Sequence, residues 1–374
     1  VYGGDMRKGR YLAPWHREAG ELGLLGEDEV RLAEVLASLR GKPAIYHCVS
    51  RIVNKDFVLQ REEKEKFVAL MRLYERFCQV RVMTFCVMSN HFHILLEVPA
   101  APEDGGASWS DEDLLGHLSS LYSEMQMREL RWELEHYRSQ KNHVAAEEFR
   151  QRFFARMWDL SAYMKVLKQC FTQWFNKRHK REGVLWEGRF KSVLVEDGHA
   201  AQTVAVYIDL NPVRAGMVTD PKDYRWSGYG EAVAGKGAAR EGLQLVMLEH
   251  EAEVKGGREY AVGEVVSWRE VVRRYRMVLY ESGEETGSRT GISREEVARV
   301  LAAGGELSEA QMRLCKVRHF VDGLVYGTEG FLEQVFALTR PYFGAARKSG
   351  ARRLRGVKTA LRTMRDLQRD PLLA

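Results

Sequence analysis

The sequence predicts an α+β protein whose strands and helices alternate in the order β-α-β-β-α-β-α. Short apolar runs of strand length alternate with longer segments in which apolar residues recur at helical spacing. Of the 374 residues, 45% are hydrophobic and 29% are charged, which is ordinary globular usage and excludes disordered, collagenous and fibrous proteins. At about 100–200 residues per domain, the chain should contain two or three domains.

The first half of this order is predicted from five segments. They are, in chain order, a helix at 27–40, a strand at 44–51, a helix at 62–78, and strands at 81–88 and 91–98. Gly41 and Pro43 end the first helix, and Ser89 with Asn90 joins the last two strands tightly. A β-α-β-β order is the larger part of a ferredoxin-like unit.

The second half follows an interruption. Residues 100–112 are small, acidic and turn-rich, and residues 111–157 carry helical periodicity, so we expect a helical insertion at about 100–157. The order then resumes with a helix at 159–178, a strand at 189–195 and a helix at 199–210, which ends at Asn211-Pro212.

The remainder is predicted to be irregular and then helical. Residues 216–265 show only patchy strand signals, and helices are expected from about 267 and at 293–303, 308–321 and 328–338. We therefore divide the chain into an N-terminal helical segment (1–43), a principal α+β domain (44–235), a connecting region (236–284) and a helical, basic C-terminal domain (285–374).

The net charge of +5 is unevenly distributed along the chain. Residues 340–374 contain ten Lys and Arg against two Asp, so the rest of the chain is slightly acidic. A second basic stretch, residues 165–191, interleaves Lys and Arg with Trp and Phe. Cations for phosphates with aromatic rings for unpaired bases are typical of a single-strand groove, although such runs can also be a solvated helix face over a core.

The cysteines and the hydropathy indicate the cellular compartment in which the protein resides. The five cysteines form no C-x-x-C pair, which argues against a disulfide framework or a zinc ribbon and for a reducing compartment. No apolar run approaches the roughly 18 residues of a membrane span, and the first residues lack the apolar core of a signal peptide. We expect a cytoplasmic protein without membrane partners.

Two histidines stand at the start of a predicted strand, in Asn90-His91-Phe92-His93. Because side chains alternate along a strand, His91 and His93 should point to one face and Phe92 to the other. Two imidazoles at this spacing can share one divalent ion. Taken alone, such a pattern is more often two unrelated histidines than a metal site.

A tyrosine and an asparagine share one face of the helix that ends at Pro212. Positions i and i+4 differ by only about 40° of rotation, so Tyr207 and Asn211 offer a phenol and an amide oxygen to the same site. A phenol has a pKa of about 10 and needs a nearby cation or base to act as a nucleophile. Without the histidines, a core tyrosine would be the simpler interpretation.

Four segments, in this order, carry a resemblance to a known family. They are A-I-Y-H-C-V-S-R, F-C-V-M-S-N-H-F-H-I-L-L-E, L-W-E-G-R-F-K-S-V-L-V-E and Y-I-D-L-N-P-V-R-A-G-M-V, within residues 44–99 and 159–218. Together they resemble the single-tyrosine HUH transposases, specifically the REP-associated tyrosine transposases. Ser89 departs from the proline that the family often has there, and the insertion of about 58 residues is a second departure.

The resemblance implies a ferredoxin-like catalytic domain, a divalent metal and single-stranded DNA with a hairpin as substrate. His91 and His93 match the HUH ligands, Tyr207 matches the nucleophile, and Asn211 stands at the amide-type third ligand. The tyrosine would attack the scissile phosphorus and form a 5′-phosphotyrosine, which a second 3′-OH can reverse. Two imidazoles with an amide oxygen suit Mg²⁺ or Mn²⁺.

Contacts to DNA are expected from both basic stretches. The side chains in question are Lys177, Arg178, Arg181, Trp186, Arg189, Lys191 and Arg214 near the site, and Arg352, Arg353 and Arg355 in the C-terminal part. Lys358, Arg362, Arg365 and Arg369 are spaced to form a stripe on one helix. The C-terminal part is therefore expected to be a helix-turn-helix-like DNA-binding module.

Two other functions stay open at this point. One is a catalytically silent, domesticated protein that binds hairpin DNA for regulation, and the other is an HUH replication or relaxase-type nickase. The intact set of His91, His93, Tyr207 and Asn211 favours catalysis, and the transposase-like context of Tyr207 disfavours the nickase. The resemblance implies a prokaryotic, nucleoid-associated protein, as a monomer or a homodimer.

Overall fold

The computed structural model describes residues 11–16, 29–254, 267–284, 319–354, 357 and 359–366. The strands are β1 (Ala44–Arg51), β2 (Arg81–Val87), β3 (His91–Val98), β4 (Lys191–Val195), β5 (Val325–Gly327), β6 (Arg352–Arg353) and β7 (Arg362–Met364). They form one sheet in the order β2-β3-β1-β4-β5-β7-β6. The predicted α+β class is confirmed.

Helices surround this sheet. The α-helices are α1 (Glu29–Leu39), α2 (Arg61–Phe77), α3 (Asp111–Leu118), α4 (Glu124–Ser139), α5 (His143–Phe154), α6 (Leu160–Arg178), α7 (His199–Asp209), α8 (Asn211–Arg214), α9 (Gly228–Val233), α10 (Gly237–Val254), α11 (Trp268–Glu284), α14 (His319–Asp322) and α15 (Glu329–Leu338). Short 3₁₀ helices are η1 (Pro14–His16), η3 (Val53–Lys55), η4 (Pro221–Asp223) and η5 (Arg340–Tyr342).

The first four strands have ferredoxin-like topology. β1 lies between β3 and β4, β2 lies outside β3, and all three pairs are antiparallel. Helix α2 connects β1 to β2, and α6 precedes β4. The predicted order of elements is therefore present, and the strand bounds match the prediction within two residues.

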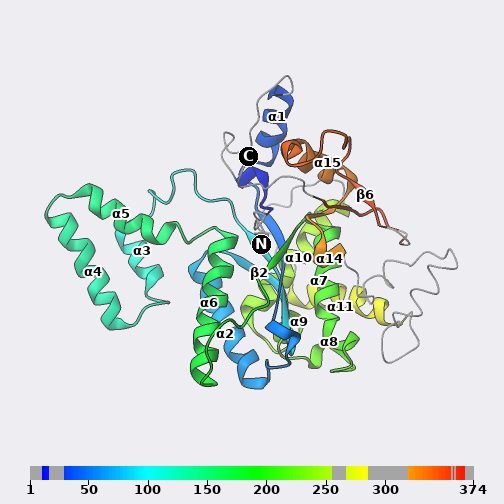
Figure 1. Ribbon diagram of the computed structural model, residues 1–374, viewed down its shortest axis with the longest axis horizontal. Coiled ribbons are helices and arrows are strands. Elements are labelled where there is room, and N and C mark those ends of the chain that lie inside the picture. The colour runs from blue at the N-terminus through cyan, green and yellow to red at the C-terminus, as the bar shows by residue number, and fades with distance from the viewer. Residues whose placement is uncertain are drawn as a thin grey trace, which may run out of the picture.

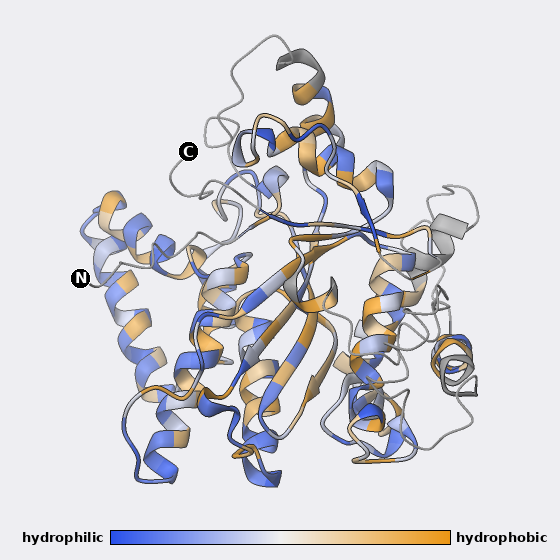
Figure 2. Ribbon diagram, turned by 45° about the vertical axis from the view of Figure 1, so that its right-hand side comes forward, coloured by the Kyte–Doolittle hydropathy of each residue, from blue (hydrophilic) through white to orange (hydrophobic). Residues whose placement is uncertain are grey.

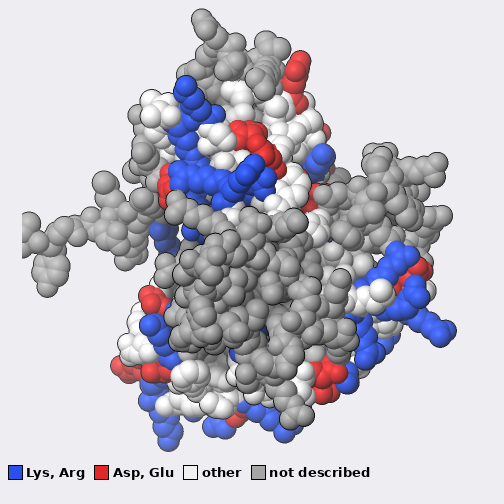
Figure 3. All heavy atoms as spheres, turned by 90° about the vertical axis from the view of Figure 1, so that its right-hand side faces the viewer, with Lys and Arg blue, Asp and Glu red and all other residues white. Residues whose placement is uncertain are grey.

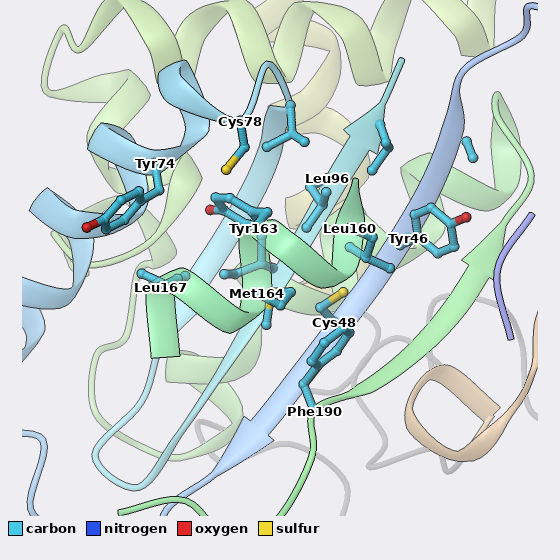
Figure 4. Packing of buried hydrophobic residues seen from close by; sticks show 14 of the residues in the cluster. Tyr46, Cys48, Tyr74, Cys78, Leu96, Leu160, Tyr163, Met164, Leu167 and Phe190 are labelled. Carbon is cyan, nitrogen blue, oxygen red and sulfur yellow. The ribbon is translucent and has the colours of Figure 1, made fainter. Parts of the chain in front are cut away.

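Both faces of the sheet are covered, which is why its strands are almost continuously apolar. On one face α2 and α6 pack together, and Tyr163 and Met164 of α6 belong to the same core cluster as Tyr46 and Cys48 of β1 (Figure 4). On the other face Ile45 of β1 joins a second core with α7, α9, α10 and α11. Figure 2 shows the central strands coloured largely as hydrophobic between these helices. The two cores hold the sheet rigidly between helical layers.

The predicted insertion is helical. Each of α3, α4 and α5 begins at a capping residue, Ser110, Ser123 and Asn142 respectively, whose side chain accepts a backbone N–H of the first turn. In Figure 1 the three helices stand to one side of the sheet.

The prediction for residues 216–265 is wrong over the part that is described, because α9 and α10 are helices. Some of the glycines in these helices serve close packing. A Cβ on Gly242 would lie 2.5 Å from the backbone oxygens of both Val82 and Met83, so only glycine lets α10 cross directly over β2.

The prediction of a helical C-terminal domain is also wrong for the residues described. α15 is confirmed, but β5 pairs in parallel with β4, and β7 and β6 extend the sheet beyond it. Arg362 lies in β7, so the predicted helical stripe does not form. The predicted helix at 293–303, most of the helix at 308–321, and Arg355, Lys358 and Arg369 lie outside the described residues. The C-terminal part thus continues the sheet.

Within the described chain, every helix is too short or too polar to cross a membrane.

Candidate active site

The two predicted histidines of β3 share one face. The ring centroids of His91 and His93 are 5.1 Å apart, with planes at 77°. Phe92 points to the opposite face, where its ring lies 4.6 Å from that of Phe67. The alternation predicted from the sequence is therefore present, and it directs both imidazoles to the face that α7 covers.

A chain of hydrogen bonds fixes the tautomer of His93. Nδ1 of His47 lies 2.6 Å from the backbone oxygen of Phe320, which can only accept, so this nitrogen carries the proton. Burial lowers the pKa of His47 to about 4, against the smaller opposing effect of this bond. His47 is therefore neutral, and its Nε2 accepts from Nδ1 of His93 at 2.9 Å. The lone pair of His93 is consequently on Nε2.

The tautomer of His91 is fixed in the same sense by its neighbour. Nδ2 of Asn90 donates to the backbone oxygen of Lys55 at 2.9 Å, which orients the amide. Its Oδ1 then accepts from Nδ1 of His91 at 2.7 Å. Both histidines thus carry their lone pair on Nε2, the arrangement that outer partners impose on metal-binding histidines.

Tyr207 of α7 lies against these rings. Its ring centroid is 5.9 Å from that of His93, 6.3 Å from that of His47 and 4.5 Å from that of Phe320. The guanidinium carbon of Arg214 lies 4.0 Å from the ring centre. This is a cation–π contact between the guanidinium and the phenol ring. The side chain is only 2% exposed, so the tyrosine is enclosed in this conformation.

Asn211 is on the same side of the helix as Tyr207, as the spacing predicted. Its Nδ2 donates to the backbone oxygens of Tyr207 and Ile208, each at 3.2 Å. Its Oδ1 accepts from Arg214 at 2.5 Å. The amide therefore ties the end of α7 to Arg214, and its assignment as a metal ligand stays a prediction.

The two histidines are suitable ligands for a divalent cation. His93 is only 4% exposed, and burial is the main cause that lowers its pKa, followed by the positive charge of His91 when protonated. A neutral imidazole is the form that binds a metal. The described residues contain no group of three or more His, Cys, Asp and Glu side chains placed for a metal. The remaining ligands would therefore be amide, water or phosphate oxygens.

A buried carboxylate lies two residues beyond the tyrosine. Asp209 is fully buried and accepts from Thr84 Oγ1 at 3.0 and 3.1 Å, from the Tyr229 N–H at 3.1 Å and from Tyr275 Oη at 2.6 Å. Burial raises its pKa to about 7, and these hydrogen bonds oppose the rise. Asp209 thus joins α7 to β2, α9 and α11.

The predicted DNA contacts near the site fall into two groups. Lys177, Arg178, Arg189 and Lys191 are exposed, and Arg181 is half-buried. Arg178 pairs with Glu62 at 2.9 Å, and Arg181 donates to a backbone oxygen. Trp186 is 9% exposed, its ring packs among Phe67, Phe92 and Phe171, and its Nε1 donates to Thr172 Oγ1 at 2.9 Å. The prediction that Trp186 stacks on bases is therefore wrong, since the ring is part of the core.

The C-terminal arginines lie on the outer strand of the sheet. Arg352 and Arg353 of β6 are exposed, and Arg352 pairs with Asp366 at 2.7 Å. Figure 3 shows basic side chains gathered in the upper part of this face, where Figure 1 places α15 and β6, with acidic side chains beside them. The surface is basic but partly neutralised.

The sequence did not indicate two members of the site. Phe320 is outside the four segments that carry the family resemblance, and it contributes a backbone atom, which any residue type could supply. Asp209 stands inside Tyr-Ile-Asp-Leu-Asn-Pro, and a carboxylate within an otherwise apolar helical run was the available signal.

Comparisons with known proteins complete the description. Residues 42–103 match the model of the family described as Transposase IS200 like. No curated protein matches the chain. A solved structure described as "Structure of the REP associates tyrosine transposase bound to a REP hairpin" is 14% identical, covers 51% of this chain and 80% of that chain, and has a TM-score of 0.33.

The family match spans β1 to β3 with His47, His91 and His93, and ends before Tyr207 and Asn211. It confirms, over residues 42–103, the resemblance of this chain to the IS200-like transposases.

Proposed function

We propose that the chain is a metal-dependent endonuclease and strand transferase that cuts single-stranded DNA beside a hairpin. The observation that carries the proposal is the enclosed cluster in which Tyr207 lies against His93, beside His91 and beneath Arg214. A phenol, two oriented imidazoles and a guanidinium are the groups that a phosphoryl transfer to tyrosine requires. The family match supports the transposase class.

Tyr207 would act as the nucleophile. Its Oη forms a bond to the scissile phosphorus while the bond from phosphorus to the 3′ oxygen breaks, and the phenol proton passes through solvent to the departing strand end, which leaves as a 3′-OH. The product is a 5′-phosphotyrosine that keeps the energy of the phosphodiester. Attack by another 3′-OH reverses the step and joins strands without ATP.

His91 and His93 would hold Mg²⁺ or Mn²⁺ through Nε2, with Asn211 as the proposed third ligand. When bound, the cation neutralises charge on the non-bridging phosphate oxygens. Arg214 adds positive charge at the phenol itself. DNA can reach Tyr207 only when part of its cover moves, because the side chain is 2% exposed. The Phe320 ring, which packs on Tyr207, is part of that cover.

The single strand would follow the exposed cations Lys177 on α6, Arg189 in the segment before β4, and Lys191 on β4. Arg352 and Arg353, on the outer strand β6, would contact phosphates farther from the cut. In this proposal the DNA partner is recognised by charge and by unpaired bases.

The test is cleavage of hairpin oligonucleotides with varied flanking bases, resolved on a denaturing gel that also detects the covalent adduct. Tyr207→Phe should abolish cleavage and the adduct while leaving hairpin binding intact, and EDTA should stop the wild type. Tyr122→Phe, in the insertion, is the matched control. Undiminished cleavage by Tyr207→Phe would refute the assignment. Hairpin binding without cleavage by the wild type, with metal supplied, would instead favour the regulatory protein.

A further inference from the structure

We propose that His47 is a positioning residue: with the backbone carbonyl of Phe320, it holds His93 in the tautomer that can bind a divalent cation. The inference rests on the proposed function, because it assigns His93 a cation to bind. His47 itself is not a ligand in this proposal, since its Nδ1 and Nε2 are occupied by Phe320 and His93.

The geometry fixes which ring nitrogen of His47 and of His93 carries the proton. A carbonyl oxygen has no proton to give, so the bond of 2.6 Å between Phe320 and His47 can run in one direction only. With its proton on Nδ1, the neutral His47 has Nε2 as an acceptor. Nδ1 of His93 therefore carries the proton of that ring, and Nε2 of His93 carries the lone pair. The two imidazoles are stacked with centroids 5.1 Å apart and planes at 20°, and both are buried, so water does not compete for these bonds.

The need for such a device follows from the chemistry of imidazole. A neutral imidazole without hydrogen bonds carries its proton on either nitrogen. An acceptor at Nδ1 selects the form whose Nε2 is ready for a metal, and loss of such an outer partner typically lowers metal affinity by about 10–100-fold. Asn90 provides this acceptor for His91, and His47 provides it for His93.

The last atom of the relay comes from a distant part of the chain. Phe320 is 273 positions from His47 and belongs to α14, which packs on β1 and β4. Its backbone oxygen contacts His47, and its ring contacts Tyr207. Phe320 therefore contacts both the histidine that orients His93 and the tyrosine of the site.

The experiment is a calorimetric titration of the full chain with Mn²⁺ alone. His47→Phe removes the acceptor and should weaken Mn²⁺ binding by about 10–100-fold. His47→Gln can present Oε1 to His93 and should restore most of the affinity, and Tyr122→Phe, in the insertion, should bind like the wild type. Equal affinity of His47→Phe and the wild type would overturn the proposal. Failure of the wild type itself to bind Mn²⁺ would overturn the metal part of the proposed function instead.

A second measurement tests the positioning without any metal or activity. Nitrogen-15 spectra of selectively histidine-labelled, metal-free protein distinguish protonated from unprotonated ring nitrogens. We expect His91 and His93 with the proton on Nδ1 in the wild type, and His47→Phe should change the signals of His93 while those of His91 stay as an internal control. A wild-type His93 protonated on Nε2 overturns the proposal, and this result requires no variant to fold.

Discussion

Replacing Asp209 by asparagine should remove part of the pH dependence of the protein's stability. The carboxyl lies at the centre of the second core, two residues from Tyr207, and its pKa is raised from 3.8 to about 7 by burial. Asparagine keeps the size and can still hydrogen bond to the hydroxyls of Thr84 and Tyr275, which rotate to donate or accept. The substitution therefore removes the charge with little change in packing.

The magnitude follows from the shift. Moving a carboxyl pKa from 3.8 to about 7 disfavours the charged form in the folded protein by about 4 kcal/mol, at roughly 1.4 kcal/mol per pH unit. Because the folded pKa is the higher one, the stabilising effect is fully present below pH 3.8 and is lost as the pH rises through about 7. Between pH 5 and pH 8, integrating this effect gives a loss of about 2–3 kcal/mol.

The assay is urea unfolding of the wild type and of Asp209→Asn at several pH values from 5 to 8. Buried His47 and His93 have lowered pKa values and act in the opposite direction, destabilising the fold as the pH falls below 6.5. They are present in both proteins, so the difference between the two unfolding free energies isolates Asp209. Cys86, whose pKa burial raises, stays neutral throughout this range.

The wild type should lose about 2–3 kcal/mol relative to Asp209→Asn from the acidic to the alkaline end. Parallel profiles would show that Asp209 titrates normally and that the buried carboxyl is not strained by desolvation. The result also concerns the site, because the charge of Asp209 near pH 7 affects how firmly its hydrogen bonds hold α7, the helix that carries Tyr207.

Three further variants test the packing and the DNA surface. Gly242→Ala should lower the unfolding free energy by about 1–3 kcal/mol, because its Cβ would meet the backbone of Met83, and Gly237→Ala, with open space around it, should not. Trp186→Ala should lower the unfolding free energy, measured in urea, by about 3–5 kcal/mol, because Trp186 is a core residue. Weaker DNA binding without a loss of stability would show instead that the ring contacts DNA. Arg353→Gln should flatten the salt dependence of hairpin affinity by about one phosphate contact, and an unchanged slope would exclude β6 from the interface.

The central half of the fold was predictable from the sequence because its signals are local. Strands β1 and β3 have the predicted bounds, since each is an apolar run of eight residues between clear turn residues. Helix α2 was predictable because its apolar residues recur at helical spacing. Strands β5 and β7 could not be found this way, because three residues carry no periodicity and pair only with partners distant in the chain.

The candidate site, too, was predictable only in part. Alternation along β3 placed His91 and His93 on one face, and the i, i+4 rule brought Tyr207 and Asn211 together on the helix. What the sequence could not supply was the partner of each polar atom. The amide oxygen of Asn211, expected at a metal, accepts from Arg214 instead in this conformation.

The placement of the C-terminal part changes how its function has to be tested. A separate DNA-binding module could be deleted with only a loss of affinity, and the sequence favoured that experiment. In the structure, however, β5 pairs with β4 in the middle of the sheet, and the Phe320 carbonyl supports the histidine pair. Deleting residues 285–374 would therefore expose an edge of the sheet and remove the acceptor of His47, so lost cleavage would say nothing about DNA contacts. Point substitutions on β6 are the informative alternative, because they change the surface charge while leaving both the sheet and the relay to His93 in place.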